Sequence, residues 1–380
     1  MKRSLQNLLA ELLCALGLPA LWRWLNRRKL VVVVYHGVVA EPPAEDTPDW
    51  HLVPIRHFTR QIDWLRRHYD IVDLDSGLAR LERNALDRPT ACITFDDGYR
   101  NNRTVALPIL AQHNAPATIF LVTGMIGTDR LLWTVALETA FRRSTLNRID
   151  LGVIGLGLRS LEKHADRQAT ASAVVRALKT LTPRSRNPIL AWLHTSLGGG
   201  TDNPPDEFRM MDWDDVRTME ATGLIAFGAH TANHEIVARL DDVELDVEIG
   251  QSVADIRANV RRPSRTFAYP NGGPNDFDPR SAGVLERLGA RWALTTIAGL
   301  NSPGTDPFRI RRITVENHTT FARFRLASSG FIEFMRRPSR LTETSIPVGA
   351  LDGQADRAVS RKAIGPGSES PQPSDRRSHG

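Results

Sequence analysis

The chain of 380 residues has little cysteine and no long hydrophobic run. Its two cysteines, Cys14 and Cys92, cannot build a disulfide framework or an all-cysteine zinc site, and they leave the redox compartment open. The longest uncharged apolar stretch near the start, residues 12–22, is about half of the roughly 20 residues that a membrane-spanning helix needs. No GxGxxG sequence follows an early strand, so the usual dinucleotide-binding fingerprint is missing.

What remains is an ordinary globular composition, with 41% hydrophobic and 24% charged residues. Such a composition supplies enough apolar side chains for a core and argues against a wholly disordered or fibrous chain. The length exceeds the roughly 250–300 residues at which a single core stops growing. We therefore expect one large domain with insertions or tails, or two domains.

The net charge of +6 is concentrated at the N-terminus. Residues 1–30 contain one acidic residue, Glu11, and six basic ones: Lys2, Arg3, Arg23, Arg27, Arg28 and Lys29. The other 350 residues are therefore nearly neutral. Since they also lack zinc-finger, RNA-recognition and helix-turn-helix patterns, we expect no nucleic-acid partner.

Leucines recur at helical spacing in the same N-terminal region, which predicts an amphipathic helix within residues 1–29. They are Leu5, Leu8, Leu9, Leu12, Leu13 and Leu16. The helix could pack on the following domain or lie on a membrane surface with its basic flank. We expect a cytoplasmic protein or one peripheral to the inner surface of a membrane. Secretion stays open, although Glu11 and the lack of a small-x-small site do not favour a signal peptide.

From residue 30 onward, short β-rich runs alternate with amphipathic helical stretches. The predicted strands are residues 30–35, 71–75, 91–95, 117–122, 224–229, 265–269 and 291–296. The predicted helices include residues 58–68, 102–114, 213–221, 243–257 and 281–288. Continuous apolar strands between amphipathic helices indicate a parallel sheet buried on both faces, and seven of them suit a barrel.

Two segments interrupt or end this α/β pattern. Residues 130–210 read as several helices with a Gly/Pro-rich exit, which predicts a helical insertion into the domain of residues 30–335. The tail, residues 336–380, is rich in Ser, Pro, Gly and charge, and we expect it to be disordered.

The sequence TFDDG at residues 94–98 places two adjacent carboxylates, Asp96 and Asp97, directly after a buried strand. Barrel enzymes carry their catalytic groups at the C-terminal ends of strands. Neighbouring carboxylates there can divide the work, one binding a cation and the other acting as a base. Taken alone, the segment is equally compatible with a solvated turn.

The sequence HTANH at residues 230–234 follows another predicted strand and brings two histidines, His230 and His234, four residues apart. Two such imidazoles can converge on one metal ion. Combined with a carboxylate from the first segment, they predict a two-histidine, one-carboxylate site with positions left for water and substrate. Zn²⁺ suits that donor set, and another divalent metal would also fit.

These two segments, in this order, resemble the first two motifs of the polysaccharide deacetylases, also called NodB-homology domains or carbohydrate esterase family 4. The resemblance covers roughly residues 30–315 and includes Tyr35-His36-Gly37 and the run FAYPNG at residues 267–272. It implies a distorted (β/α)7 barrel, a zinc-type metal and hydrolysis of acetamido groups on an N-acetylated polysaccharide or a glycolipid-linked glycan.

The resemblance also implies residue roles. Asp97, His230 and His234 would be the metal ligands. Asp96 would be the general base that takes a proton from the attacking water. The backbone N–H of Asn271 would donate to the oxyanion.

The chain departs from the family pattern at two points. Most relatives have an arginine where this chain has Ala268, and that arginine orients the catalytic aspartate. Arg311 or Arg312 could replace it, although both could equally be solvated strand-end residues. The usual Leu-x-His motif, which supplies the acid for the leaving amine, is absent, and His36 is a candidate acid or substrate contact.

Three tryptophans, Trp50, Trp64 and Trp133, could line a sugar-binding groove, but single tryptophans more often pack in a core or at its rim.

Two alternatives to N-deacetylation follow from the two departures from the family pattern. An O-acetyl esterase would need no strong acid, because an alkoxide leaves more readily than an amine. A catalytically degenerate barrel would bind glycan without turnover.

Overall fold

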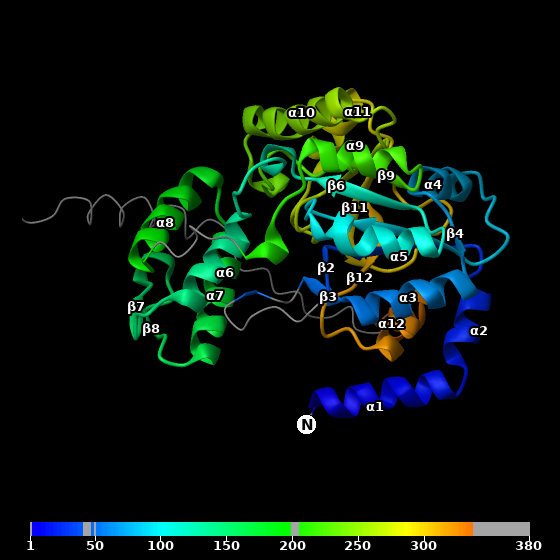
Figure 1. The fold of residues 1–380 in the computed structure, drawn as a ribbon, viewed down its shortest axis with the longest axis horizontal. Coiled ribbons are helices and arrows are strands. Elements are labelled where there is room, and N and C mark those ends of the chain that lie inside the picture. Colours follow the sequence, from blue (N-terminus) through cyan, green and yellow to red (C-terminus); the bar gives the residue numbers. More distant parts are fainter. Residues whose placement is uncertain (1, 41–46, 49–50, 199–204, 337–380) are drawn as a thin grey trace, which may run out of the picture.

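The computed structural model describes residues 2–40, 47–48, 51–198 and 205–336. Most of them form a parallel barrel ringed by helices, with a helical insertion on one side and two N-terminal helices beneath (Figure 1). The predicted tail therefore lies outside the described residues, apart from Arg336. No single described helix is long and apolar enough to cross a membrane. Among the described residues, one pair of helical segments, Leu5–Ala15 and Leu18–Leu25, has the combined length and apolar composition of a membrane span, with a bend of 69° between the two segments.

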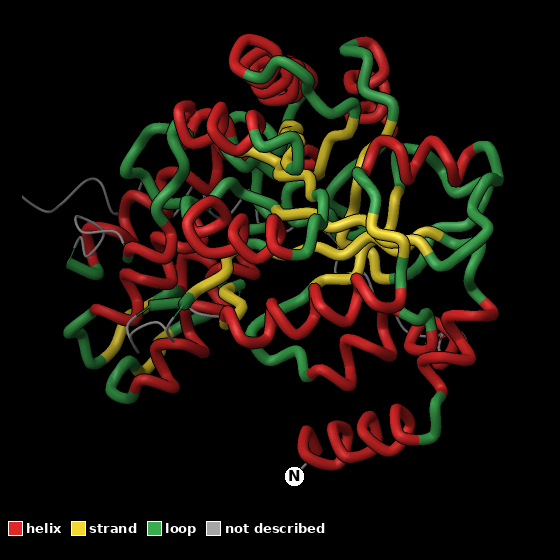
Figure 2. The backbone as a smooth tube through the Cα atoms, turned by 45° about the vertical axis from the view of Figure 1, so that its right-hand side comes forward, coloured by secondary structure: helices red, strands yellow, loops and turns green. Residues whose placement is uncertain are grey.

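Seven parallel strands close into a barrel because β1 pairs with both β12 and β5. The barrel strands are β1 (Leu30–Tyr35), β5 (Thr90–Phe95), β6 (Ala117–Leu121), β9 (Ile225–Ala229), β10 (Thr266–Ala268), β11 (Trp292–Ala298) and β12 (Ile310–Thr314). In Figure 2 these strands lie at the centre of a shell of helices. The predicted (β/α)7 barrel is thus confirmed.

One predicted barrel strand was wrong. Residues 71–75 supply only the end of β4 (Asp70–Ile71), which pairs with β5 outside the closed ring. Asp73 accepts a hydrogen bond from the Ser76 amide and starts helix α4 (Leu74–Glu82), so capping chemistry overrides the strand pattern. The seventh barrel strand is β12 instead, which the sequence analysis did not include.

Helices cover the outside of the barrel, and the sequence predicted most of them within a few residues. They are α3 (Ile55–His68), α4, α5 (Leu107–Gln112), α9 (Trp213–Ala221), α10 (Asp242–Asn259), α11 (Pro279–Arg287) and α12 (Phe321–Ser328). Except for α4, their buried faces join the outward-facing strand residues in the largest apolar cluster of the described residues. Trp64 belongs to this cluster, with its ring 5.8 Å from that of Phe324, and so packs in the core.

Alternate strand residues fill the barrel interior, and this alternation positions the site. A second apolar cluster joins Val32, Cys92, Phe120, Ala268, Leu294 and Ile310 to the leucines of α4. Because side chains alternate along a strand, Asp96 and Arg312 share the inward orientation of Cys92 and Ile310. The interior is therefore apolar on the α4 side and polar at the C-terminal ends of the strands.

The insertion lies between β6 and β9. It comprises α6 (Trp133–Arg143), the short ribbon of β7 (Arg148–Asp150) and β8 (Leu158–Ser160), α7 (His164–Leu178) and α8 (Pro183–Ser196). It has an apolar cluster of its own, from Leu137 to Leu197. Figure 1 shows it beside the barrel rather than over the α4 end.

Helices α1 (Lys2–Ala15) and α2 (Leu18–Leu25) lie against the C-terminal helices. One face of α1 is buried, since Ala10 and Cys14 pack with Ala322, Leu326 and Phe331. This contact agrees with the first of the two interpretations of the leader, a helix packed on the domain. The opposite face is exposed and still carries leucines.

Candidate active site

The polar end of the barrel brings the predicted metal ligands together. Nε2 of His230 lies 3.7 Å from Oδ1 of Asp97, and Nε2 of His234 lies 3.4 Å from the same oxygen. One ligand atom from each residue falls within a 4.8 Å cluster, and all three residues are buried. Among the described residues Oδ1 of Asp97 has no hydrogen-bond partner, and such an unpaired buried oxygen is what a metal ligand presents when no metal is bound. The donor set and geometry therefore fit a zinc-type ion.

A backbone carbonyl orients His230, and a glutamate carboxylate holds the loop of His234. Nδ1 of His230 lies 2.6 Å from the carbonyl oxygen of Ala268, which can only accept, so Nδ1 carries the proton and Nε2 keeps its lone pair. Ala268 is the position where relatives carry an arginine, and here its carbonyl orients a ligand. The loop before His234 is held by Glu248 of α10, which accepts bonds of 2.9 and 2.7 Å from the main chain and side chain of Asn233.

Backbone strain is concentrated at this site. Six non-glycine residues in the described chain have left-handed φ angles, and four of them are Asp97, Thr231, His234 and Asn271. Such conformations cost about 1–3 kcal/mol each and persist where the surrounding structure enforces them. The barrel thus stabilises the strained loops that bring Asp97 and His234 together.

Arg312 holds the predicted base. Its guanidinium donates two bonds of 2.7 Å to the two oxygens of Asp96, and its Nε donates to the carbonyl of Thr295 at 2.8 Å. The Arg312 side chain is fully buried inside the barrel. Arg311 points elsewhere and lies 3.4 Å from Glu333 near the surface. Of the two candidate replacements for the missing arginine, the structure therefore brings Arg312, from β12, to Asp96.

The two adjacent aspartates have opposite electrostatics. Burial is the largest single influence and would raise the pKa of Asp96. The charges of Arg312, His230 and His36 and the hydrogen bonds from Arg312 together outweigh it and bring that pKa down to about 2. For Asp97, burial and the neighbouring Asp96 charge raise the pKa to about 7, although a hydrogen bond from Tyr99 works in the other direction. In the metal-free protein Asp96 is therefore ionised throughout the neutral range, while Asp97 is partly protonated near neutral pH.

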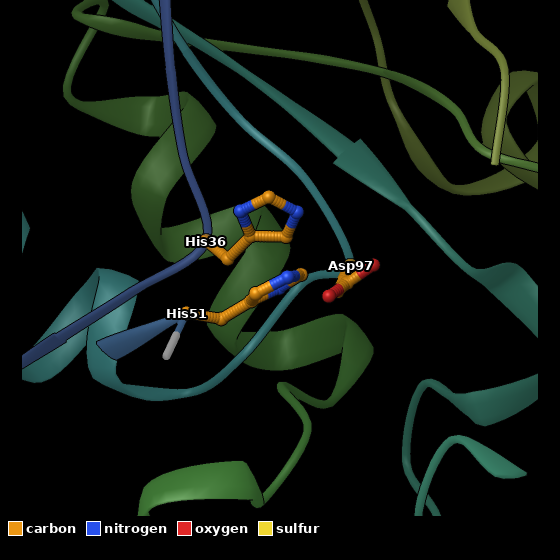
Figure 3. A group of neighbouring side chains, drawn as sticks. All are labelled: His36, His51 and Asp97. Atoms are coloured by element: carbon orange, nitrogen blue, oxygen red, sulfur yellow. The ribbon is translucent and has the colours of Figure 1, made fainter. Parts of the chain in front are cut away.

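His36 reaches the same end of the barrel from the end of β1, and a further histidine, His51, lies beside it. Their ring centroids are 3.8 Å apart, and both side chains face Asp97 (Figure 3). Burial lowers the pKa of His36 to about 4, and it also lowers the pKa of His51 well below its usual value. A neutral His36 is better suited to contacting substrate than to donating a proton as an acid.

The sequence analysis missed His51 because no motif marks it. It precedes the three-residue strand β3 (Leu52–Pro54), which pairs with β2 (Gly37–Val39) and so comes to lie beside His36. It also missed Lys179 of the insertion, whose charge acts on His36, His51 and His234. Only the tertiary structure places these residues at the site.

Asn271 follows β10 in a left-handed turn and lies partly exposed, with its carbonyl accepting a 2.5 Å bond from the Thr296 hydroxyl. Its role as oxyanion donor stays a prediction.

Trp133 is half-buried in the insertion, where the Arg186 guanidinium lies 4.9 Å from the centre of its ring. Trp50 lies outside the described residues.

Comparisons with known proteins identify the family and the fold. The polysaccharide deacetylase family matches residues 83–293. The Bacillus subtilis (strain 168) protein YxkH, which is named as a polysaccharide deacetylase, is 27% identical over 101 residues, covering 26% of this chain and 34% of that relative. The curated relative is therefore matched over about a third of its length.

Two solved structures share the fold. The Streptococcus pyogenes deacetylase PplD, solved in complex with acetate, has a TM-score of 0.52 at 16% identity, covering 79% of this chain and 98% of its own. IcaB from Ammonifex degensii has a TM-score of 0.52 at 18% identity, covering 79% and 97%. His36, His51 and Arg312 lie outside the stretch matched by the family, but the motifs at residues 94–98 and 230–234 lie inside it. This chain belongs to the polysaccharide deacetylase family.

Proposed function

We propose that the protein is a metal-dependent deacetylase that hydrolyses acetamido groups of an N-acetylated glycan, either a polysaccharide or a glycolipid-linked chain. The observation that carries the proposal is the convergence of Asp97, His230 and His234 beside an Arg312-bound Asp96. A divalent cation held by the first three residues supplies Lewis acidity, which favours attack of water on an acetyl carbonyl near neutral pH.

The chain's own residues have distinct roles in this proposal. Asp96 is ionised and held by two bonds, so it can accept a proton from the attacking water without rotating away. The Asn271 N–H donates to the oxygen that becomes negative. His36, neutral and near Asp97, contacts the substrate beside the reacting group.

The test compares the wild-type protein with Asp96→Asn and His230→Ala on chitooligosaccharides, with free amine and acetate as readouts. We expect Asp96→Asn to lower kcat by about 10²–10⁴-fold, the usual range for a general base. Asp87→Asn and His164→Ala, both at exposed positions outside the motifs, serve as matched controls. Equal activity in all five proteins would contradict the mechanism.

O-deacetylation is a second candidate. It is favoured by the low pKa of His36, because a neutral His36 cannot act as the acid that protonates a departing amine. An ester needs less protonation of its leaving group. Relative rates on N-acetyl and O-acetyl substrates decide between the two activities. Glycan binding without turnover at any added metal would instead favour the degenerate barrel.

We further propose that α1 and α2 dock the enzyme on an anionic membrane at its inner surface. Their outward apolar residues are each 48–69% exposed: Leu5, Leu8, Leu9, Leu12, Leu16, Leu21, Trp24 and Leu25. Residues 1–30, which include both helices, carry most of the net positive charge of the chain. An exposed apolar face combined with basic residues is the combination that binds anionic lipid surfaces.

Vesicle co-sedimentation tests this docking with the full chain. Vesicles with phosphatidylglycerol should retain the protein, and those of phosphatidylcholine alone should retain less. Leu8→Ser/Leu12→Ser should weaken binding, whereas Leu158→Ser, equally exposed on the insertion, should not. Self-association in solution that the same double substitution abolishes, without vesicle binding, would assign the face to a second copy and overturn the proposal.

A further inference from the structure

A second group of metal-ligating side chains lies at the mouth of the barrel. One ligand atom each from His36, His51 and Asp97 falls within a 4.8 Å cluster, just as for Asp97, His230 and His234. The two clusters share Asp97. In Figure 3 the two imidazoles lie one above the other, with their ring edges toward the Asp97 carboxylate.

The chain holds this group in place through a short parallel ribbon. The Gly37 amide donates to the His51 carbonyl at 3.2 Å, and Gly37 is in register with Leu52 of β3. Glycine at position 37 allows a close approach, because a Cβ would lie 2.6 Å from the Leu52 side chain. His51 is tied by main-chain bonds to the residue that follows His36, which keeps the backbones of the two histidines adjacent.

Two polar atoms of the group are buried and unpaired. Among the described residues, neither Nδ1 of His36 nor Oδ1 of Asp97 has a hydrogen-bond partner, and the two residues are only 8% and 2% exposed. Buried polar atoms in native proteins are nearly always satisfied, and leaving one unpaired is costly. A bound cation would share the Asp97 carboxylate and use the lone pairs of the histidines.

We propose that His36, His51 and Asp97 bind a second divalent cation of the zinc type, with Asp97 bridging it to the first. Two imidazoles and a carboxylate are the donors that zinc and its neighbours prefer. Two-metal hydrolases hold their ions roughly 3.5–4 Å apart, a spacing that one shared carboxylate can span. This second site goes beyond the deacetylase proposal, which needs one cation.

Metal stoichiometry tests the proposal. The full chain is stripped with a chelator, dialysed against Zn²⁺, and analysed for bound metal, with Co²⁺ absorption as a second readout. We expect two equivalents for the wild type and His164→Ala, and one for His51→Gln or His230→Ala. The double variant His51→Gln/His230→Ala should lose both, and the far-ultraviolet circular dichroism of each variant shows that it has folded.

Saturation of the wild type at one equivalent would overturn the second site, as would two equivalents in folded His51→Gln. These outcomes are separable from the proposed function. One bound equivalent with deacetylase activity would leave the function and remove the second site. Two bound equivalents without activity on any acetylated glycan would keep the site and remove the function.

Discussion

The barrel and the helical insertion differ in how they contribute to the site. In the barrel, Asp96, Asp97 and His230 lie just beyond the ends of β5 and β9, and the closed sheet fixes their relative positions. The insertion has a separate apolar cluster and reaches the site through few polar contacts. Among them, Arg186 of α8 pairs with Glu235 at 2.6 Å, and Arg239 donates to the Lys179 carbonyl at 3.4 Å.

This difference indicates a division of labour. The chemistry belongs to the barrel, whose residues need the closed ring in order to meet. The insertion adjusts that chemistry, because Glu235 directly follows His234 and Lys179 adds a positive charge near the ligands. Substitutions in the barrel should therefore abolish function or stability, whereas those in the insertion should shift affinities.

The largest effect should come from Arg312→Met in the barrel. The substitution leaves the Asp96 carboxylate buried without its partner, and breaking a buried pair in this way costs about 3–5 kcal/mol of unfolding free energy. Denaturant unfolding measures the loss. Arg311→Met is the control, since the exposed pair of Arg311 with Glu333 should contribute at most about 1 kcal/mol.

A second variant distinguishes the loss of the Arg312–Asp96 ion pair from the loss of Arg312 side-chain packing. Arg312→Met/Asp96→Asn removes the uncompensated charge and should recover part of the lost stability, but not activity. If the double variant is no more stable than Arg312→Met alone, the loss would come from the shape of the Arg312 side chain rather than from the buried charge.

A smaller effect is expected from Arg186→Met in the insertion. Arg186 donates two bonds to Glu235 and lies over the Trp133 ring, so it links α6 and α8 to the loop of His234. Residues that orient metal ligands typically contribute about 10–100-fold in metal affinity, and we expect a loss at the lower end of that range. Titration with Zn²⁺ measures it.

The control for this variant lies on the same helix. Arg184 is exposed on α8, so Arg184→Met should leave the Zn²⁺ affinity unchanged. Equal metal affinity in the wild type and Arg186→Met would mean that the insertion does not position the site, and the division of labour would then rest on Lys179 alone.

The same comparison explains what the sequence could predict. The barrel and the motifs of Asp96, Asp97, His230 and His234 were predictable because strand patterns and motif residues are local signals. For Arg312 the sequence left two candidates, Arg311 and Arg312, and for His51 and Lys179 it held no signal, since each position depends on which distant segment lies opposite. Ring closure brings β12 to Asp96, and the β2–β3 ribbon brings His51 to His36. The strand assigned to residues 71–75 failed because one capping aspartate outweighed a short apolar pattern.

The smallest effect should come from relieving strain at the barrel rim. Asn271 has a φ of 58°, and glycine adopts that conformation without a Cβ penalty, so Asn271→Gly should raise the unfolding free energy by at most about 1 kcal/mol. Activity should persist, because the proposed donor is the backbone N–H. Asn114→Gly, at φ 46° far from the motifs, should give a similar gain in stability. A large loss of kcat in Asn271→Gly alone would assign the contribution to the Asn271 side chain and not to its main chain.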